Sequence, residues 1–430
     1  MQTVLVLGAN GLIGAVCCRA LSDAGFRVLG LGRRRHALTA SSPCQGWMVH
    51  DLTTLDRRAW AECLTGVDIV VNAAGALQDG PRDNLDAIHA TMPTELCAAA
   101  SPGMRFVQIS AAGVSPEAST EFFRSKARGD AAIARSACDW VILRPSLVIA
   151  PEAYGGTALL RGAAALPGVL PVVLPDSSVK TVHIDDLSAA VVAAARGDIA
   201  PGTCADVTND TAWPLPELTA RVRSWLGLPP PRLRLPVPTS LLALIGKGAD
   251  ALGWLGWRSP LRSTAMTVLS DGVGGDPGPL RAAGLPPPRG LDDTLAALPG
   301  TRQERLYARL YFLLPLAIAV LSLFWLISGL VALARPAAAA SVLSESALPG
   351  WAIWTAVIGG AVTDVALGLG ILWRRWCRAS ALGMIAVSLI YLFGGTLFAP
   401  GLWLDPLGPL VKVLPSILLA LVVWLGVEDR

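Results

Sequence analysis

Three glycines near the start of the chain, Gly8, Gly11 and Gly14, are spaced so that bare backbone could hold a pyrophosphate group. They follow a β-branched apolar segment, residues 3–7, and precede an apolar stretch with helical spacing. A dinucleotide site needs a tight turn, bare backbone beside the phosphates and a close helix–strand contact, which three glycines can provide. The N–H groups that open the helix would bind the phosphate oxygens, and a turn used only for packing is the alternative. The predicted cofactor contacts at this turn are Gly8, Asn10, Gly11, Leu12, Ile13 and Gly14.

The loop after the second expected strand, residues 28–31, contains the consecutive arginines Arg33, Arg34 and Arg35 and no acidic residue. An NAD site would place Asp or Glu here, against the adenosine ribose. The planar fork of an arginine instead matches the oxygens of a phosphate. We therefore predict NADP(H) rather than NAD(H) as the cofactor, with Arg33 and Arg34 as contacts. A solvated surface run is the alternative.

A scaffold must bring these loops together, and the first half of the chain alternates short apolar strands with helical stretches. This alternation predicts a parallel sheet covered by helices on both faces, with right-handed crossovers. The expected fold is therefore a doubly wound α/β (Rossmann) sheet, in which the ligand lies at the carboxyl ends of the strands. The expected strands are residues 3–7, 28–31, 47–49, 68–72, 105–110 and 140–143.

Two further loops at these carboxyl ends have residues suited to a nucleotide. Asp51 and Leu52, after the third strand, are predicted to face the adenine. The small residues Ala73, Ala74 and Gly75, after the fourth strand, would let the chain pass close to the cofactor.

Seven short motifs follow one another along this part of the chain. They are Gly8-x-x-Gly11-x-x-Gly14, Asp51-Leu52, residues 72–75, residues 109–113, Arg124-Ser125-Lys126, residues 143–146 and residues 182–187. In this order they resemble the short-chain dehydrogenase/reductase superfamily, in particular its extended and atypical branches. These branches include the group that resembles the nucleotide-binding accessory subunit of respiratory complex I. The resemblance covers roughly residues 1–300 and implies a nicotinamide cofactor.

The resemblance also implies roles for single residues. Ser110 would supply the hydroxyl that follows the fifth strand, and Lys126 would be the lysine of the family's Tyr-x-x-x-Lys helix, which binds the nicotinamide ribose. The tyrosine position is occupied by Phe122, which has no ionisable hydroxyl. Loss of such a general acid costs a factor of ~10²–10⁴ unless another group donates the proton. Tyr154, just past residues 143–146, is the candidate substitute, with packing of a substrate loop as the alternative.

No metal site and no nucleic-acid partner are predicted. His183, Asp185 and Asp186 lack a third, suitably spaced ligand. The eight cysteines show no metal-binding spacing and are expected to be reduced core residues. The net charge of +3 is too small to favour nucleic acid.

The second half contains four apolar runs that are long enough to cross a hydrocarbon core of ~30 Å. These runs are residues 310–334, 348–373, 379–399 and 407–427. Arginines precede the first run and separate the second from the third. The positive-inside bias then predicts a multi-pass protein of the plasma (inner) membrane whose N-terminal domain and C-terminus are both cytoplasmic. In span number and hydropathy this part is similar to the DoxX-like four-helix membrane family.

We therefore expect three regions. Residues 1–200 would form the Rossmann domain, residues 201–300 a substrate-side region that completes the soluble domain, and residues 301–430 the four-span domain. Residues 239–257 are amphipathic and are expected to pack in a core, with contact to a bilayer surface as the alternative.

Two ionisable residues, Asp364 and Lys412, fall within the apolar runs. Asp364 shares a helical face with Gly360 and Gly368, so it should point toward a neighbouring helix. A charge at this depth calls for a partner or a function, and an interhelical pair between the two residues is the preferred interpretation.

Together these patterns predict a membrane-anchored, atypical short-chain dehydrogenase/reductase that binds NADP(H) and reduces a hydrophobic carbonyl or a quinone-type substrate. Its partners would be the lipid bilayer, a lipid-like substrate, and either a membrane-complex partner or a second copy of the chain. The alternative, which Phe122 favours, is a non-catalytic NAD(P)H-binding assembly or sensor module of a membrane complex.

Overall fold

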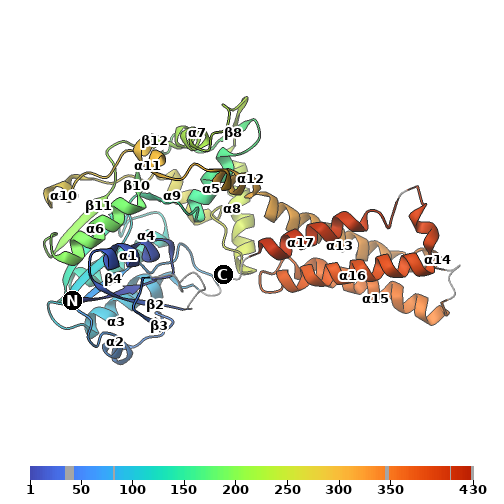
Figure 1. Ribbon diagram of the computed structural model, residues 1–430, viewed down its shortest axis with the longest axis horizontal. Coiled ribbons are helices and arrows are strands. Elements are labelled where there is room, and N and C mark those ends of the chain that lie inside the picture. Colours follow the sequence, from blue (N-terminus) through green and yellow to red (C-terminus); the bar gives the residue numbers. More distant parts are fainter. Residues whose placement is uncertain (34–42, 81–82, 344–347, 407, 428–430) are drawn as a thin grey trace. The chain divides into compact units, whose positions relative to one another are not determined.

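The computed structural model describes residues 1–33, 43–80, 83–343, 348–406 and 408–427. The chain forms two compact units (Figure 1). The first consists of Met1–Asp250 and Ser259–Ala308, and the second of Ala251–Arg258 and Arg309–Arg430.

A seven-stranded sheet with the order β11-β6-β5-β4-β1-β2-β3 forms the centre of the first unit. All of its neighbouring strands run parallel. The strand order reverses between β1 and β4, which is the position where doubly wound sheets bind ligands. The predicted α/β fold is thus confirmed, although the edge strand β11 was not predicted. The strands are β1 (Thr3–Leu7), β2 (Arg27–Gly32), β3 (Gly46–Val49), β4 (Ile69–Asn72), β5 (Arg105–Ile109), β6 (Asp139–Pro145) and β11 (Thr203–Val207).

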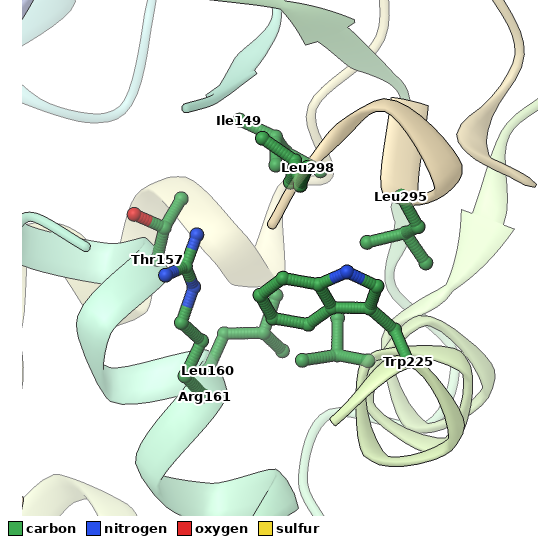
Figure 2. Close-up of a pocket in the computed structure, with 8 residues that line it drawn as sticks. Ile149, Thr157, Leu160, Arg161, Trp225, Leu295 and Leu298 are labelled. Carbon is green, nitrogen blue, oxygen red and sulfur yellow. The ribbon is translucent and has the colours of Figure 1, made fainter. Parts of the chain in front are cut away.

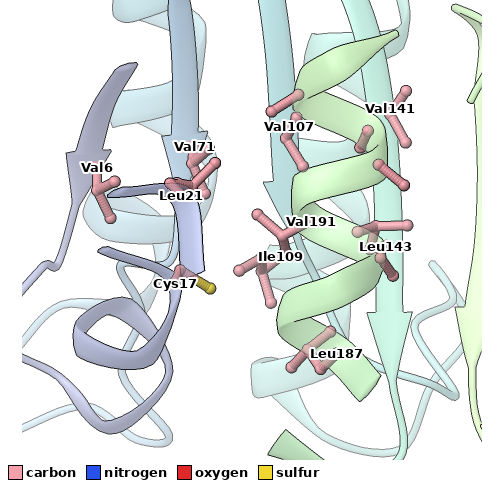
Figure 3. Packing of buried hydrophobic residues seen from close by; sticks show 14 of the residues in the cluster. Val6, Cys17, Leu21, Val71, Val107, Ile109, Val141, Leu143, Leu187 and Val191 are labelled. Atoms are coloured by element: carbon pink, nitrogen blue, oxygen red, sulfur yellow. The ribbon is translucent and has the colours of Figure 1, made fainter. Parts of the chain in front are cut away.

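Helices cover both faces of this sheet because successive side chains of a strand point in opposite directions. Val4 and Val6 of β1 join one core cluster with helices α1 (Leu12–Asp23) and α6 (Ile184–Arg196), shown in Figure 3. Leu5 and Leu7 join a second cluster on the other face. That face is covered by α2 (Arg57–Cys63), α3 (Met92–Ala99) and α4 (Glu121–Ala134).

The rest of the first unit is a smaller layer with its own apolar cluster. It contains α5 (Gly155–Ala164), α7 (Leu215–Trp225), α9 (Ser263–Ser270), α11 (Leu291–Ala297), and the short strands β7 (Leu147–Ile149), β8 (Val169–Val172), β9 (Ser178–Val179), β10 (Thr181–His183), β12 (Trp213–Pro214) and β13 (Leu233–Pro236). Helix α10 (Gly278–Ala282) instead packs on the first core cluster through Leu280. Helix α8 (Thr239–Trp254) runs from the first unit into the second. The expectation that its apolar residues pack in a core is wrong for one side of the helix, where Trp254 is 74% exposed.

The second unit is a bundle of apolar helices. Its helices are α13 (Leu313–Ala334), α14 (Pro336–Ser341), α15 (Gly350–Gly370), α16 (Cys377–Phe398) and α17 (Val413–Gly426), with the turn η3 (Pro400–Trp403), and α12 (Arg302–Leu310) leads into it. Three helical segments, Arg302–Ala334, Gly350–Gly370 and Cys377–Phe398, are long and apolar enough to cross a membrane.

The fourth expected span is shorter than predicted. Its helix α17 has 14 residues, which gives about 21 Å at about 1.5 Å per residue. Gly408, at a φ of +57°, and Pro409 keep the preceding segment out of the helix.

Asp364 of α15 is buried among three helices of this bundle. Ser328 of α13 donates a hydrogen bond to its carboxylate over 3.1 Å, and Tyr391 of α16 donates another over 3.0 Å. Lys412 is exposed before α17, and the structure shows no ion pair between it and Asp364, both of which it describes. The buried carboxylate is therefore satisfied by hydroxyl groups.

Candidate active site

The glycine turn after β1 has no room for side chains. Gly8 has a φ of +69°, and an added Cβ would lie 2.9 Å from the Cα of Ala74. A Cβ on Gly14 would lie 2.2 Å from the carbonyl oxygen of Gly8. Only glycine fits this backbone, so the turn has the bare cradle that a pyrophosphate requires.

Helix α1 opens directly at this cradle. Its N-cap, Gly11, offers no side-chain acceptor to the first N–H groups of the helix, which include those of Ile13 and Gly14. These groups and the positive end of the helix dipole favour an anion. Asn10 lies beside the end of β2, because a Cβ on Gly32 would come within 2.9 Å of its Oδ1 atom.

The structure describes one of the two arginines predicted to contact the cofactor. The Nη2 atom of Arg33 lies 3.1 Å from Oδ1 of Asp83, and both side chains are partly exposed. Arg34 lies outside the described residues. Any phosphate that binds Arg33 would thus compete with a carboxylate that already contacts it.

The two residues predicted to face the adenine, Asp51 and Leu52, have different surroundings at the end of β3. The carboxylate of Asp51 accepts hydrogen bonds from the backbone N–H and the hydroxyl of Thr53, which fix the loop. Leu52 is buried in the core cluster beneath this loop.

The loop after β4 connects the glycine turn with the lysine helix. The buried side chain of Asn72 accepts a hydrogen bond from the Ala74 N–H and so holds the loop against Gly8. One residue further, a Cβ on Gly75 would lie 3.8 Å from Nζ of Lys126. Residues 73–75 therefore extend from the expected pyrophosphate position to the expected nicotinamide position.

Lys126 is 7% exposed on α4, and its Nζ atom lies 3.5 Å from the carbonyl oxygen of Ile109. Burial lowers the pKa of Lys126 to about 8, and the nearby Asp130 carboxylate opposes this shift. The ammonium group is thus buried yet easily deprotonated.

Ser110, Asp130 and Arg144 form a polar group beside this lysine. The Ser110 hydroxyl donates to Asp130 Oδ2 over 2.8 Å, and Arg144 Nη2 donates to the same oxygen over 2.9 Å. Burial raises the pKa of the Asp130 carboxyl, and Arg144 and Ser110 oppose that shift. The structure therefore brings Ser110 and Lys126 together through Asp130.

Phe122 lies one helical turn before Lys126. The Lys126 ammonium is 5.7 Å from the centroid of the phenyl ring. The same ring meets His89 edge-to-face at 5.7 Å. A phenyl ring without a hydroxyl group thus lies where the family resemblance implies a tyrosine side chain.

Sequence reasoning missed His89, which lies in the π-helical turn η2 (Ala87–Thr91). Its Nε2 atom accepts from the Ala76 N–H over 3.2 Å, which assigns the proton to Nδ1, 2.9 Å from the Ser125 hydroxyl. Burial, and then the charges of Lys126 and Arg128, lower the pKa of His89 to about 3. The His89 imidazole is therefore neutral, and its hydrogen bonds link the β4 loop to α4.

Helix α4 packs against η2 without any space between the backbones. A Cβ on Gly129 would lie 1.8 Å from the carbonyl oxygen of His89. No sequence signal pointed to His89, whereas Asp130 could have been noticed because it follows Lys126 by one helical turn.

The structure does not bring Tyr154 to this group. Tyr154 is 50% exposed at the N-cap of α5, and no hydrogen bond joins it to Ser110 or Lys126 within the described residues.

The side chains of His183, the last residue of β10, and of Asp186 make structural contacts. His183 Nδ1 accepts the Asp185 N–H and caps α6, and Asp186 pairs with Arg289.

A small apolar cavity lies away from these residues, between α5, α7 and α11 (Figure 2). Its volume of about 10 Å³ is room for about one water molecule. The Arg161 guanidinium in its wall donates to the carbonyl oxygens of Ala150 and Pro151. We interpret this cavity as a packing gap, too small for a substrate.

Two family models match the chain. One, described as NAD(P)H-binding, matches residues 8–168, and the other, described as the DoxX-like family, matches residues 322–421. The chain therefore combines an NAD(P)-binding Rossmann domain with a C-terminal DoxX-like domain, as the two resemblances predicted. The DoxX-like match and the three apolar helices indicate association with a membrane.

One relative is the ceramide reductase of Caulobacter vibrioides (strain NA1000 / CB15N). It is 28% identical over 247 residues, which are 56% of this chain and 75% of the relative.

Two solved structures share the fold of the first unit. The Bordetella bronchiseptica enzyme WbmG in complex with NAD has a TM-score of 0.52 and 17% identity, over 69% of this chain and 92% of WbmG. The UDP-glucuronic acid 4-epimerase from Bacillus cereus, in complex with UDP-glucuronic acid and NAD, has a TM-score of 0.51 and 17% identity, over 72% of this chain and 99% of the epimerase.

Proposed function

We propose that this chain is a membrane-anchored oxidoreductase of the atypical short-chain type, which uses NADP(H) to reduce a hydrophobic carbonyl compound. The observation that carries the proposal is Lys126, buried beside Ser110 and Asp130 at the carboxyl end of β5 and next to Gly75 of the β4 loop. Among the described residues Lys126 has no salt bridge, and the nearby Asp130 carboxylate, whose Oδ2 atom accepts a hydrogen bond from Arg144, opposes only part of the effect of burial.

The residues of the first unit fit a nicotinamide cofactor. The cradle of Gly8, Gly11 and Gly14 and the first turn of α1 would hold the pyrophosphate. The β4 loop would pass along the cofactor toward Lys126. When bound, the reduced cofactor supplies the hydride for the reaction.

The reaction also needs a proton donor, and we assign this role to Lys126. Ser110 has a single hydroxyl proton, which it donates to Asp130. Phe122 has none to give. Burial lowers the pKa of Lys126 to about 8, near neutral pH, where general acids are efficient. An N–H bond of the ammonium would break as an O–H bond forms on the substrate, and water would then reprotonate Nζ.

The choice of NADP(H) and of a lipid-like substrate rests on two further features. Arg33 is placed at the end of β2, where a 2′-phosphate would lie. The DoxX-like domain would give the site access to membrane-soluble compounds, and the relative from Caulobacter is named for reducing a lipid, ceramide. A quinone-type substrate is compatible with the same arrangement.

Phe122 favours a second candidate function, a nucleotide-binding module without turnover. In this case the nucleotide would stabilise the first unit, and the apolar helices would assemble with a partner.

The experiment uses the full chain in lipid nanodiscs. Binding of NADPH and NADH is measured by calorimetry, and consumption of NADPH is followed with long-chain aldehydes, keto-lipids and quinones. Consumption that Lys126→Met reduces by ~10² or more, with nucleotide binding retained, supports the reductase. Nucleotide binding without consumption on any compound supports the second function.

A further inference from the structure

One side of α8 is apolar and exposed along the whole helix. Leu244 is 67% exposed and Trp254 is 74% exposed, while Leu242 and Ala249 are buried on the opposite side. We call the exposed side the α8 apolar face. Its apolar residues are Leu241, Leu244, Ile245, Leu252 and Trp254. The exposed Lys247 lies on the same side, between Leu244 and Trp254 around the helix.

The end of α8 belongs to the unit that contains the candidate spans. The carbonyl oxygen of Leu255 accepts a hydrogen bond from the Arg374 N–H over 3.0 Å. The Trp257 indole donates to the carbonyl oxygen of Leu372 over 2.6 Å. Arg374 also lies over the Trp257 ring, 5.4 Å from its centroid. These contacts fix the end of α8 to the connection between α15 and α16.

This connection is where two candidate spans end, and so it marks the edge of the hydrocarbon region. The spans are Gly350–Gly370 and Cys377–Phe398. The end of α8, residues 251–254, is therefore expected at the level of the lipid headgroups. Exposed tryptophan and basic residues are typical of that level, and Trp254, Lys247 and Arg375 are of these types.

We propose that α8 lies in the headgroup region of an anionic bilayer, with the α8 apolar face turned toward the acyl chains. The basic residues near this face would contact anionic headgroups. The proposal does not depend on catalytic turnover.

The same helix contacts the loop that approaches the cofactor site. Asp250 of α8 accepts hydrogen bonds from Gln78 Nε2 over 3.0 Å and from Arg262 Nε over 3.2 Å. Gln78 belongs to the loop that follows β4 and contains Gly75. Asp250 therefore links α8 to the β4 loop within the first unit.

The test measures the surroundings of Leu244 in the full chain. Cys44 and Cys204, which are not buried, are first replaced by serine. Leu244→Cys is then labelled with an environment-sensitive fluorophore in nanodiscs that contain anionic lipid. Quenching by lipid-bound spin labels is compared with quenching by iodide in water.

Two control positions calibrate the measurement. Leu330→Cys on α13, where the side chain is 54% exposed, represents a lipid-facing site. Arg58→Cys on α2, where the side chain is 89% exposed, represents water. Trp254→Cys serves as a second position on the α8 apolar face if the first variant does not fold.

We expect the label at Leu244 to be quenched by spin labels near the headgroups at least three-fold more than the label at Arg58, and to be protected from iodide. Quenching by iodide equal to that at Arg58 would overturn the proposal. Protection from both quenchers would also overturn it, because a protein surface such as a second copy of the chain would then cover the face.

Discussion

The Lys126 ammonium lies 5.7 Å from the centroid of the Phe122 ring, one helical turn away on α4. The pair has the spacing of the tyrosine–lysine pair that the family resemblance implies, with a phenyl ring in place of the phenol. The cation and the ring face attract each other weakly, so the phenyl group stabilises the buried charge without being able to donate a proton.

Restoring the hydroxyl is therefore the most direct test of the chemistry. Phe122→Tyr places an ionisable group beside Lys126, which would lower the pKa of the new phenol and make it a better acid. We expect reduction of a simple carbonyl compound to rise by about ten-fold or more, measured as NADPH consumption.

Phe123→Tyr is the matched control, since Phe123 is the neighbouring phenylalanine and is buried on another side of α4. It should leave the rate unchanged or lower it through misfolding. An equal rise in both variants would argue against a role for the position of the hydroxyl.

The pH dependence tests Lys126 as the proton donor. Its pKa of about 8 means that the ammonium form is present below this pH and is lost above it. We expect kcat/KM for reduction to be level up to about pH 8 and then to fall about ten-fold per pH unit. Arginine stays protonated throughout, so Lys126→Arg should remove the fall at whatever activity it retains. A fall that persists in this variant would assign the proton to another group.

Asp83 is predicted to limit the affinity for NADP(H). Its carboxylate lies 3.1 Å from the Arg33 guanidinium and would repel a 2′-phosphate. Asp83→Asn should tighten NADP(H) binding by up to about 5-fold, because exposed ion pairs of this kind contribute ~0.2–1 kcal/mol. NAD(H) binding, measured by calorimetry in the same way, should not change.

Arg33 and Arg34 can be tested together in the same assay. Replacing both with alanine should abolish any preference for NADP(H) and leave NAD(H) binding nearly unchanged. Equal affinity of the unaltered chain for both nucleotides would contradict the predicted role of these arginines.

The sequence was sufficient to predict six of the seven strands of the sheet, because these are short apolar runs that alternate with helical stretches. The order of the motifs along the chain also identified Ser110 and Lys126 as candidate site residues. The sequence could not predict His89, because a single histidine in a helix shows no spacing signal until the fold places it between Ala76 and Ser125. For residues 239–257 the sequence favoured core packing and left a bilayer surface as the alternative, since amphipathic spacing does not say which surface covers the apolar side.

Asp364 is predicted to hold three helices of the second unit together. Asp364→Leu removes the acceptor of both Ser328 and Tyr391, and each such hydrogen bond in a membrane contributes ~0.6–2 kcal/mol. Asp364→Asn keeps one acceptor oxygen and should be milder. Thermal unfolding in nanodiscs measures both, with Thr363→Ala as a control, because Thr363 is exposed and bonds within its own helix. A melting temperature of Asp364→Leu equal to that of the control would contradict the prediction.

Reporter fusions test the number of crossings and their direction. The arginines Arg374, Arg375 and Arg378 predict a cytoplasmic connection between α15 and α16. Reporters at residues 337–343 should then appear on the opposite side, and a reporter after Arg430 on the cytoplasmic side. If α17, with its 14 residues, does not cross, the reporter after Arg430 will instead appear on the side of residues 337–343.

The closeness of Gly129 to His89 also restricts how this site can evolve. A methyl group at position 129 would overlap the His89 carbonyl oxygen, so any larger residue would push α4 away from η2 and lift Lys126 from the end of β5. The lysine is thus useful only while residue 129 has no side chain. Loss of nucleotide chemistry would remove the constraint on Lys126, whereas residue 129 would still have to be glycine for α4 to pack against η2.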